Sequence, residues 1–207
     1  MAGITKYADL LNEAQGVAPL CPPNELIFQF RRAFQEFCRV SQAWREWLEF
    51  IETVNQQDYP LAPLLEFEAD VIDIADFRMK AANSTNSFDF GYPQHPSTWR
   101  FNRVADNPIV TTAWTPSATG ERILRVLAVL VPSNDAREID DQDFFARWWR
   151  GVLAKALYET LKMDGKPWYN PTEAETRRRE YWNIVGDAKR EASLALIGAN
   201  GNDGMTG

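Results

Sequence analysis

The sequence is poor in the side chains that most often bind metal ions or form cross-links. Its 207 residues include a single histidine, His95, and two cysteines, Cys21 and Cys38. A structural zinc site takes about four Cys or His ligands, and a disulfide scaffold takes several cysteine pairs. The composition therefore excludes both classes of protein. We expect no bound metal ion, no cofactor and two reduced, buried thiols.

Sequence motifs for nucleotide binding and nucleophilic catalysis are also missing. Neither a Gly-rich phosphate loop nor a G-x-S-x-G elbow occurs. The one histidine lies in the proline-flanked segment 92–96, where an exposed loop residue is the simpler interpretation. No apolar run approaches the length of a membrane span. We predict that the chain is not an enzyme, has no catalytic residues and does not bind a membrane.

The charge balance is acidic, with 29 Asp and Glu against 22 Lys and Arg and a net charge of −7. General nucleic-acid binding needs clustered cations against phosphate, so this chain is a poor candidate for it. Its two basic runs are Arg31-Arg32 and Arg177-Arg178-Arg179. Glutamates flank the second run three to four residues away, so ion pairs along a helix explain it. Contact with nucleic acid or with a partner subunit stays open as the alternative for these arginines.

Carboxylates form two clusters along the chain, and paired acids can perform acid–base catalysis or hold Mg²⁺. The clusters are Glu66, Glu68, Asp70, Asp73 and Asp76, and then Glu138, Asp140, Asp141 and Asp143. The second cluster fits the N-terminus of a helix, where exposed N–H groups favour carboxylates. The first fits a solvated strand or loop edge. A metal-dependent nuclease or hydrolase using the first cluster is kept as an alternative.

The period of apolar residues and the position of Pro and Gly divide the chain into segments. Residues 1–44 have helical spacing, residues 45–135 alternate as strands around a long loop at 81–98, and residues 136–197 have helical spacing again. Residues 117–120 are expected to join the last two strands as a hairpin. The Gly-rich segment 198–207 is expected to be a flexible tail. We predict an α+β fold: one bundle of N- and C-terminal helices with an inserted antiparallel β-sheet subdomain.

Aromatic residues are abundant, with 8 Trp and 12 Phe. Trp148 and Trp149 are neighbours on a predicted helix, about 100° apart, so they cannot both face one core. Trp168 and Tyr169 lie in a connector between two predicted helices. Such an excess indicates either a protein interface or a large aromatic core, and the sequence leaves both open.

Several of these residues resemble motifs of the head-to-tail adaptor (connector) proteins of tailed bacteriophages. The matching residues are Cys21-Pro22, followed by a helix with Ala33, Phe37-Cys38 and Trp44, and later Val131-Pro132, Asp135-Ala136 and Gly165-Lys166-Pro167-Trp168-Tyr169-Asn170-Pro171. The last run is similar to a G-K-P-W-x-[ND]-P pattern of that family. The resemblance covers both helical ends and is weak through residues 55–107, where the loop 81–98 looks like an insertion.

The resemblance implies a structural protein of the virion neck, between capsid and tail, assembled in the host cytoplasm. Such adaptors form a homo-oligomeric ring, typically of about twelve subunits, beneath the portal protein. The helical bundle builds the ring, the C-terminal segment reaches the portal, and the sheet region faces the next tail or nozzle protein. DNA passes through the channel without specific binding, which an acidic wall favours.

A tail-completion, stopper or tail-tube protein of the same neck is the nearest alternative. On the adaptor interpretation, the candidate interface residues are aromatic, basic or part of the C-terminal segment. They are Trp148, Trp149, Trp168, Tyr169, Arg177, Arg178, Arg179, Ile197, Asn200 and Met205.

Overall fold

Helices from both ends of the chain form one unit, and the strands between them form a second. The computed structural model describes residues 7–65, 68–81, 93–104, 107–117, 122–133 and 141–201. The helical unit comprises Met1–Trp44 with Pro132–Gly207, and the β unit comprises Arg45–Val131. The predicted α+β fold, with terminal helices bundled together and an inserted antiparallel β subdomain, is confirmed.

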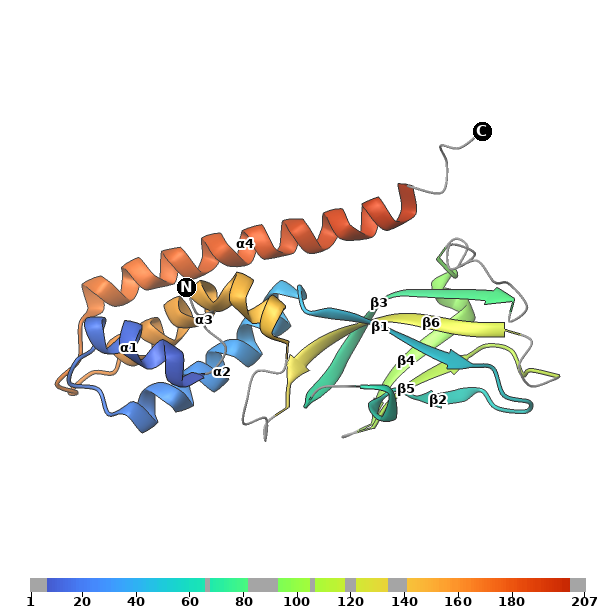
Figure 1. Ribbon diagram of the computed structural model, residues 1–207, viewed down its shortest axis with the longest axis horizontal. Helices are drawn as coiled ribbons and strands as arrows, with labels where there is room; N and C mark the ends of the chain where they lie inside the picture. The colour runs from blue at the N-terminus through green and yellow to red at the C-terminus, as the bar shows by residue number, and fades with distance from the viewer. Residues whose placement is uncertain are drawn as a thin grey trace. The chain divides into compact units, whose positions relative to one another are not determined.

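The helical unit is built around α3. Its helices are α1 (Tyr7–Val17), α2 (Pro23–Ser41), α3 (Gln142–Leu161) and α4 (Pro171–Gly201). α3 packs against both α2 and α4, and α1 packs on α2 and α3 (Figure 1). Segments about 100 residues apart in the sequence therefore share one core.

Local sequence signals set most helix boundaries. α3 begins after Asp141, whose carboxylate accepts a hydrogen bond from the Phe144 N–H at 2.8 Å. α4 begins after Asn170, whose side-chain oxygen accepts from the Glu173 N–H at 3.1 Å. α2 ends at Ser41 rather than near residue 44, because Gln42 adopts the left-handed conformation, with φ of 52°.

The C-terminal helix continues farther than the sequence indicates. α4 extends to Gly201, so residues 198–201 of the predicted tail are helical, and its flexibility stays a prediction. Adding a residue to an existing helix costs far less than starting one, and this outweighs the low propensity of glycine. The rest of that segment, 202–207, lies outside the described residues, as do 82–92 of the expected loop 81–98.

An aromatic cluster fills the centre of the helical unit. The Phe34 ring stacks on Trp44 at 5.9 Å between centroids and meets Phe145 edge-on at 5.4 Å. Phe37 contacts Trp148 and Tyr181, which brings α2, α3 and α4 together. Much of the aromatic excess is thus accounted for by a core, one of the two explanations that the sequence left open.

A buried lysine joins α2 to α3 inside this unit. Lys155 Nζ lies 2.6 Å from Glu36 Oε1 and 2.9 Å from Glu159 Oε1. Burial alone lowers the pKa of Lys155, but its hydrogen bonds to the two carboxylates outweigh that effect and raise the pKa. The ammonium therefore stays charged in the folded protein.

The β unit contains two three-stranded antiparallel sheets. One sheet has the order β1-β6-β3, and the other has the order β2-β5-β4. The strands are β1 (Arg45–Ile51), β2 (Asp58–Pro60), β3 (Ala69–Ala81), β4 (Trp99–Val104), β5 (Asn107–Thr112) and β6 (Arg122–Pro132). Short 3₁₀ turns occupy Ala62–Leu64 and Pro96–Thr98.

The predicted hairpin between the last two strands is wrong, because β5 and β6 belong to different sheets. β6 pairs with β1, with Trp47 opposite Leu127, and is buried continuously from Val126 to Pro132. A central strand covered on both faces explains why its apolar residues do not alternate.

Aromatic pairs and one buried carboxylate join the two sheets. Phe50 stacks on Tyr59 at 4.8 Å, and Phe77 contacts Trp99 at 5.6 Å between ring centroids. The Trp114 indole N–H donates to buried Glu52 Oε1 at 2.6 Å. These contacts link β1 and β3 of one sheet to β2, β4 and the end of β5 in the other.

The contact of α3 with its neighbours predicts a specific effect of replacing Gly151. A Cβ at this position would lie 2.8 Å from Phe37 Cε2 and 3.0 Å from Ile184 Cγ2. We expect Gly151→Ala to lower the free energy of unfolding by about 1–3 kcal/mol, because overpacking forces the helices apart. Chemical denaturation measures the change.

A matched helical glycine provides the control. Gly186 on α4 has open space where a Cβ would stand. Gly186→Ala is expected to raise the free energy of unfolding by up to about 1 kcal/mol through helix propensity alone. Equal effects of the two substitutions would contradict close packing at Gly151.

A second prediction concerns the Tyr181 hydroxyl, which is buried and has no hydrogen-bond partner among the described residues. Burial, with the nearby Glu36 and Cys38, raises the pKa of Tyr181. We expect Tyr181→Phe to raise the free energy of unfolding by about 1 kcal/mol, because it removes an unsatisfied polar group. The reference is Tyr59→Phe, which removes a hydroxyl that donates to the Gln56 carbonyl at 3.0 Å and should destabilise. A loss of stability in Tyr181→Phe would contradict the prediction.

Candidate protein interface

Large apolar side chains are exposed mainly on the helical unit. Seven such residues occur in the described part of the chain, and five belong to that unit. Leu20 is 65% exposed, Phe28 52% and Trp182 48%. The full set is Leu20, Phe28, Tyr169, Trp182 and Leu194, against Ile51 and Val54 in the β unit. Exposed apolar residues mark a protein interface where they gather into one patch, and these five are the candidates for such a patch on the helical unit.

A small cavity lies where the α1–α2 connector meets the α3–α4 connector. Its volume is about 180 Å³, and Leu20, Leu161, Trp168 and Tyr169 contribute to its wall. The Trp168 indole Nε1 is buried and has no hydrogen-bond acceptor among the described residues. Two predicted interface residues therefore border a hollow on the surface of the helical unit.

The other two predicted tryptophans are half-buried rather than exposed. Trp148 contacts the Phe37 ring at 6.0 Å, and the Arg147 guanidinium lies 5.5 Å from its ring centroid. The Trp149 ring lies 5.5 Å from the Arg150 guanidinium. Trp148 thus belongs partly to the core, and Trp149 is covered in part by its neighbour on the helix. The side chains of Ile197 and Asn200 on α4, and all of Met205, lie outside what the structure describes.

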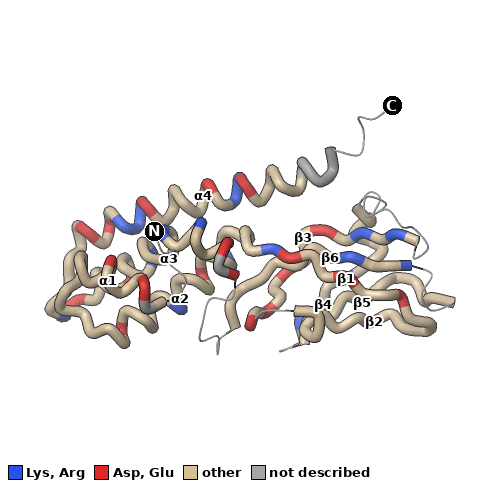
Figure 2. Tube along the Cα trace, in the orientation of Figure 1, with Lys and Arg blue, Asp and Glu red and all other residues tan. Residues whose placement is uncertain are grey.

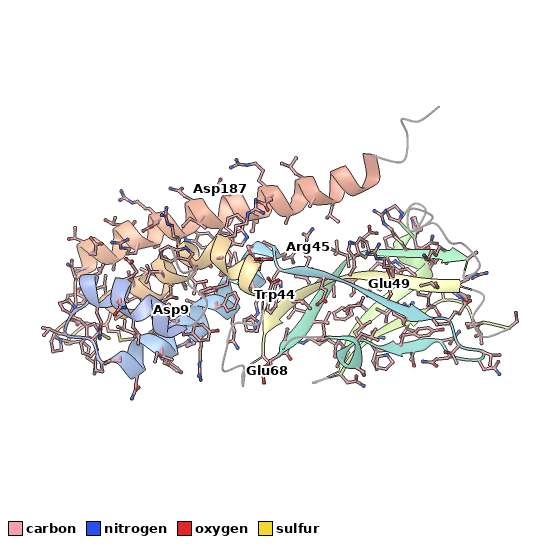
Figure 3. The ribbon with its side chains drawn as sticks, viewed as in Figure 1. Asp9, Trp44, Arg45, Glu49, Glu68 and Asp187 are labelled. Atoms are coloured by element: carbon pink, nitrogen blue, oxygen red, sulfur yellow. The ribbon has the colours of Figure 1, made fainter. Side chains whose placement is uncertain are left out.

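The arginine run on α4 forms ion pairs along its own helix. Arg177 reaches Glu173 at 2.8 Å and Glu180 at 2.9 Å. Arg178 holds both oxygens of Glu175, at 2.7 and 2.8 Å, and Arg179 lies 3.4 Å from the same carboxylate. Positive and negative residues alternate along α4 in Figure 2, and Figure 3 labels Asp187, which pairs with Arg190. The ion-pair explanation of this run is confirmed.

The arginines on α2 are arranged differently. Arg31, Arg32 and Arg39 are exposed, and among the described residues none of them forms an ion pair. The Arg32 guanidinium lies 5.5 Å from the centroid of the exposed Phe28 ring. The sequence identifies Arg31-Arg32 as a basic run, but it does not show that Phe28 and Arg39 share an exposed surface with it.

The acidic cluster near β3 is held by local hydrogen bonds. The Asp76 carboxylate accepts from Arg78 Nε at 2.8 Å, and both side chains are buried. Asp73 accepts from the Ile74 N–H. In the described ranges, no three Asp, Glu, His or Cys side chains are grouped as metal ligands would be. Glu66 and, from the second cluster, Glu138 and Asp140 lie outside those ranges.

Both cysteines are free and buried, as predicted. Burial raises the pKa of the Cys21 thiol to about 11 and that of Cys38 well above its usual value. Thiolate is the reactive form of cysteine, so both side chains are poor nucleophiles. His95 Nδ1 accepts from the Ser97 N–H at 3.2 Å, which gives this histidine a local role at the start of a 3₁₀ turn.

A scan against protein-family models finds no match to this chain, and neither does a search of curated protein sequences. None of the helices in the described residues is long and apolar enough to cross a bilayer.

The bidentate pair on α4 predicts a measurable titration. Hydrogen bonds from Arg178 hold the pKa of Glu175 at about 2, below the 4.5 of an unperturbed carboxyl. The pair therefore stabilises the helix at every pH above about 4.5, and the contribution is lost as the pH falls from there towards about 2. Carboxyl NMR titration of the intact protein should show this low midpoint.

Replacing the partner should move the titration back. In Arg178→Gln the midpoint of Glu175 is expected to rise towards its ordinary value, while Arg190→Gln, several turns away on α4, leaves it unchanged. A midpoint near 4.5 in the unsubstituted chain would show that the pair is not formed in solution.

Proposed function

We propose that this chain is the head-to-tail adaptor of a tailed bacteriophage, a structural protein that forms a ring between portal and tail. The observation that carries the proposal is the set of exposed apolar side chains on the helical unit. Interfaces between copies of one chain are on average more apolar than the rest of the protein surface. The helical unit has that surface, and it is also the part that resembles the adaptor family in sequence.

The architecture supports the same assignment. In the adaptor family the helical bundle builds the ring and the sheet region faces the next tail component. This chain has a helical unit formed from both ends and a separate β unit with only two exposed large apolar residues in its described part. The proposed location is the virion neck. The proposed partners are copies of this chain, the portal protein and a tail or nozzle protein.

The charge fits a channel through which DNA passes without binding. At −7 per chain, a ring of subunits carries a large negative charge in total. The ion pairs on α4 neutralise the most basic run of the sequence. Repulsion from phosphate then favours sliding over adhesion.

Assembly on the portal tests the proposal. Purified chain, mixed with portal rings from the same viral genome, is expected to add a ring of density beneath the portal in electron micrographs. A double variant, Leu20→Ser with Trp182→Ser, should reduce ring occupancy several-fold, because it removes apolar contacts between neighbours.

The β unit offers the matched control. Ile51→Ser with Val54→Ser changes two exposed apolar residues outside the helical unit and should leave the ring on the portal intact. A chain that never associates with portal, under conditions in which portal binds its other partners, would refute the adaptor function.

A further inference from the structure

The outward face of α2 combines one aromatic ring with three arginines. Phe28, Arg31, Arg32 and Arg39 recur at helical spacing on the side away from the buried residues of this helix, and together they form the α2 basic face. The Arg32 guanidinium and the Phe28 ring are in contact range, at 5.5 Å. Aromatic and arginine side chains are among the types most enriched at protein interfaces.

In the described part of the chain, the arginines of the α2 basic face are not paired with negative charge. The arginines of α4 pair with glutamates, whereas those of α2 have no carboxylate partner among the described residues. The chain as a whole has seven more acidic than basic residues, 29 against 22. A complementary acidic surface is therefore available on a second copy of the same chain.

The outward face of α1 has that complementary chemistry. Asp9, Asn12, Glu13 and Gly16 are exposed, and we call them the α1 acidic face. The face carries two carboxylates one helical turn apart and no basic residue. A Cβ at Gly16 would meet no atom within 4 Å, so the surface there is open. Figure 3 labels Asp9 on this helix.

The two faces match in shape when the helices run antiparallel. Phe28 is the one bulky aromatic ring of the α2 basic face, and Gly16 is the one position of the α1 acidic face without a side chain. Placing the ring on the glycine lets the two helices approach closely, as a large residue against a small one does. This pairing fixes the register of the contact.

The same register also places opposite charges together. Arg32 lies four residues beyond Phe28 on α2, and Glu13 lies three residues before Gly16 on α1. With a rise of about 1.5 Å per residue, the two side chains differ by only about 1.5 Å in height along antiparallel helices. Both also fall on the same side of the Phe28–Gly16 contact, because each is offset in the same sense around its helix.

The remaining polar residues agree with this register. Asp9 lies one turn before Glu13 and already interacts within its own chain, so Glu13 is the carboxylate that Arg32 meets. Arg31 falls next to Asn12, whose side-chain oxygen is a hydrogen-bond acceptor. Within one chain the pairing cannot form, because α1 and α2 already pack together through other residues, including Tyr7 and Phe34.

We infer that the α2 basic face of one subunit packs antiparallel on the α1 acidic face of a second copy. The contact joins two different surfaces of the same chain, so repetition of it generates a ring or an open helix. This inference rests on the proposed adaptor function for the ring, but the contact itself is a property of the isolated chain. Exposed ion pairs are weak singly, and closure of a ring multiplies their effect.

Charge reversal tests the ionic part of the contact. Arg32→Glu places a second carboxylate beside Glu13, and Glu13→Arg places two guanidinium groups together. Each variant should weaken self-association by about three- to tenfold in sedimentation experiments at low salt. Arg100→Glu, the same change of charge on β4, should have no effect. Thermal melts establish that each variant is folded.

Recombining the reversed residues gives the decisive measurement. An equimolar mixture of Arg32→Glu and Glu13→Arg, and a single chain carrying both substitutions, should each recover the association of the unsubstituted chain. Retained association in the two single variants, or failure of both recombinations, overturns the inference.

Filling the glycine tests the shape of the contact independently of charge. Gly16→Gln adds a neutral side chain where the isolated subunit has open space, so the fold should tolerate it, but the added atoms occupy the place of Phe28 from the second copy. We expect a loss of self-association of at least about threefold. Gly186→Gln on α4, which also has open space around it, is the matched control. Equal association of both glutamine variants and the unsubstituted chain overturns the register.

The contact and the adaptor function fail in distinguishable ways. An unsubstituted chain that stays monomeric at about millimolar concentration, where even weak contacts form, overturns the contact, and it leaves recruitment by portal as a separate question. A closed two-fold dimer abolished by the reversals supports the contact but counts against a ring.

Discussion

The close contact of Gly151 with Phe37 and Ile184 sets the geometry of the helical unit. At this position α3 approaches α2 and α4 so closely that a single methyl group would have no room. The Phe37 ring fills the space left by the glycine, and Phe144 connects it to the stacked rings of Phe34 and Trp44. Because α2 precedes the β unit in the sequence and α3 follows it, this contact also joins the helical segment before the β unit to the one after it.

Much of the fold could be predicted from local sequence. Helix starts are marked by Pro22-Pro23, Asp141 and Asn170. Proline fits a first turn because it has no N–H to leave unpaired, and the side chains of Asp141 and Asn170 accept hydrogen bonds from free N–H groups of that turn. The pairing of strands could not be predicted. β5 and β6 are neighbours in sequence but belong to different sheets, and the choice of strand partner depends on distant contacts such as Phe77 with Trp99.

The candidate interface residues could be predicted only partly from the sequence. The excess of tryptophan indicates either an aromatic core or a protein interface. Only the three-dimensional structure shows that Trp148 is half-buried and Trp182 is exposed. The same holds for the arginines. Neighbouring glutamates identify the paired run on α4, but the surroundings of Arg31 and Arg32 depend on the packing of other helices. Surface apolar residues such as Phe28 lie outside the buried stripe of a helix, where periodicity alone does not decide exposure.

The insertion of the β unit between α2 and α3 has a consequence for synthesis of the chain. α1 and α2 leave the ribosome first, but the helix that covers Phe34 and Phe37 follows only after Arg45–Val131 has been made. About 100 residues separate the end of α2 from the start of α3, so at about 5–20 residues per second roughly 5–20 seconds separate the two events. During that interval the apolar side of α2 has no α3 to cover it, so the nascent helices expose apolar surface that favours aggregation.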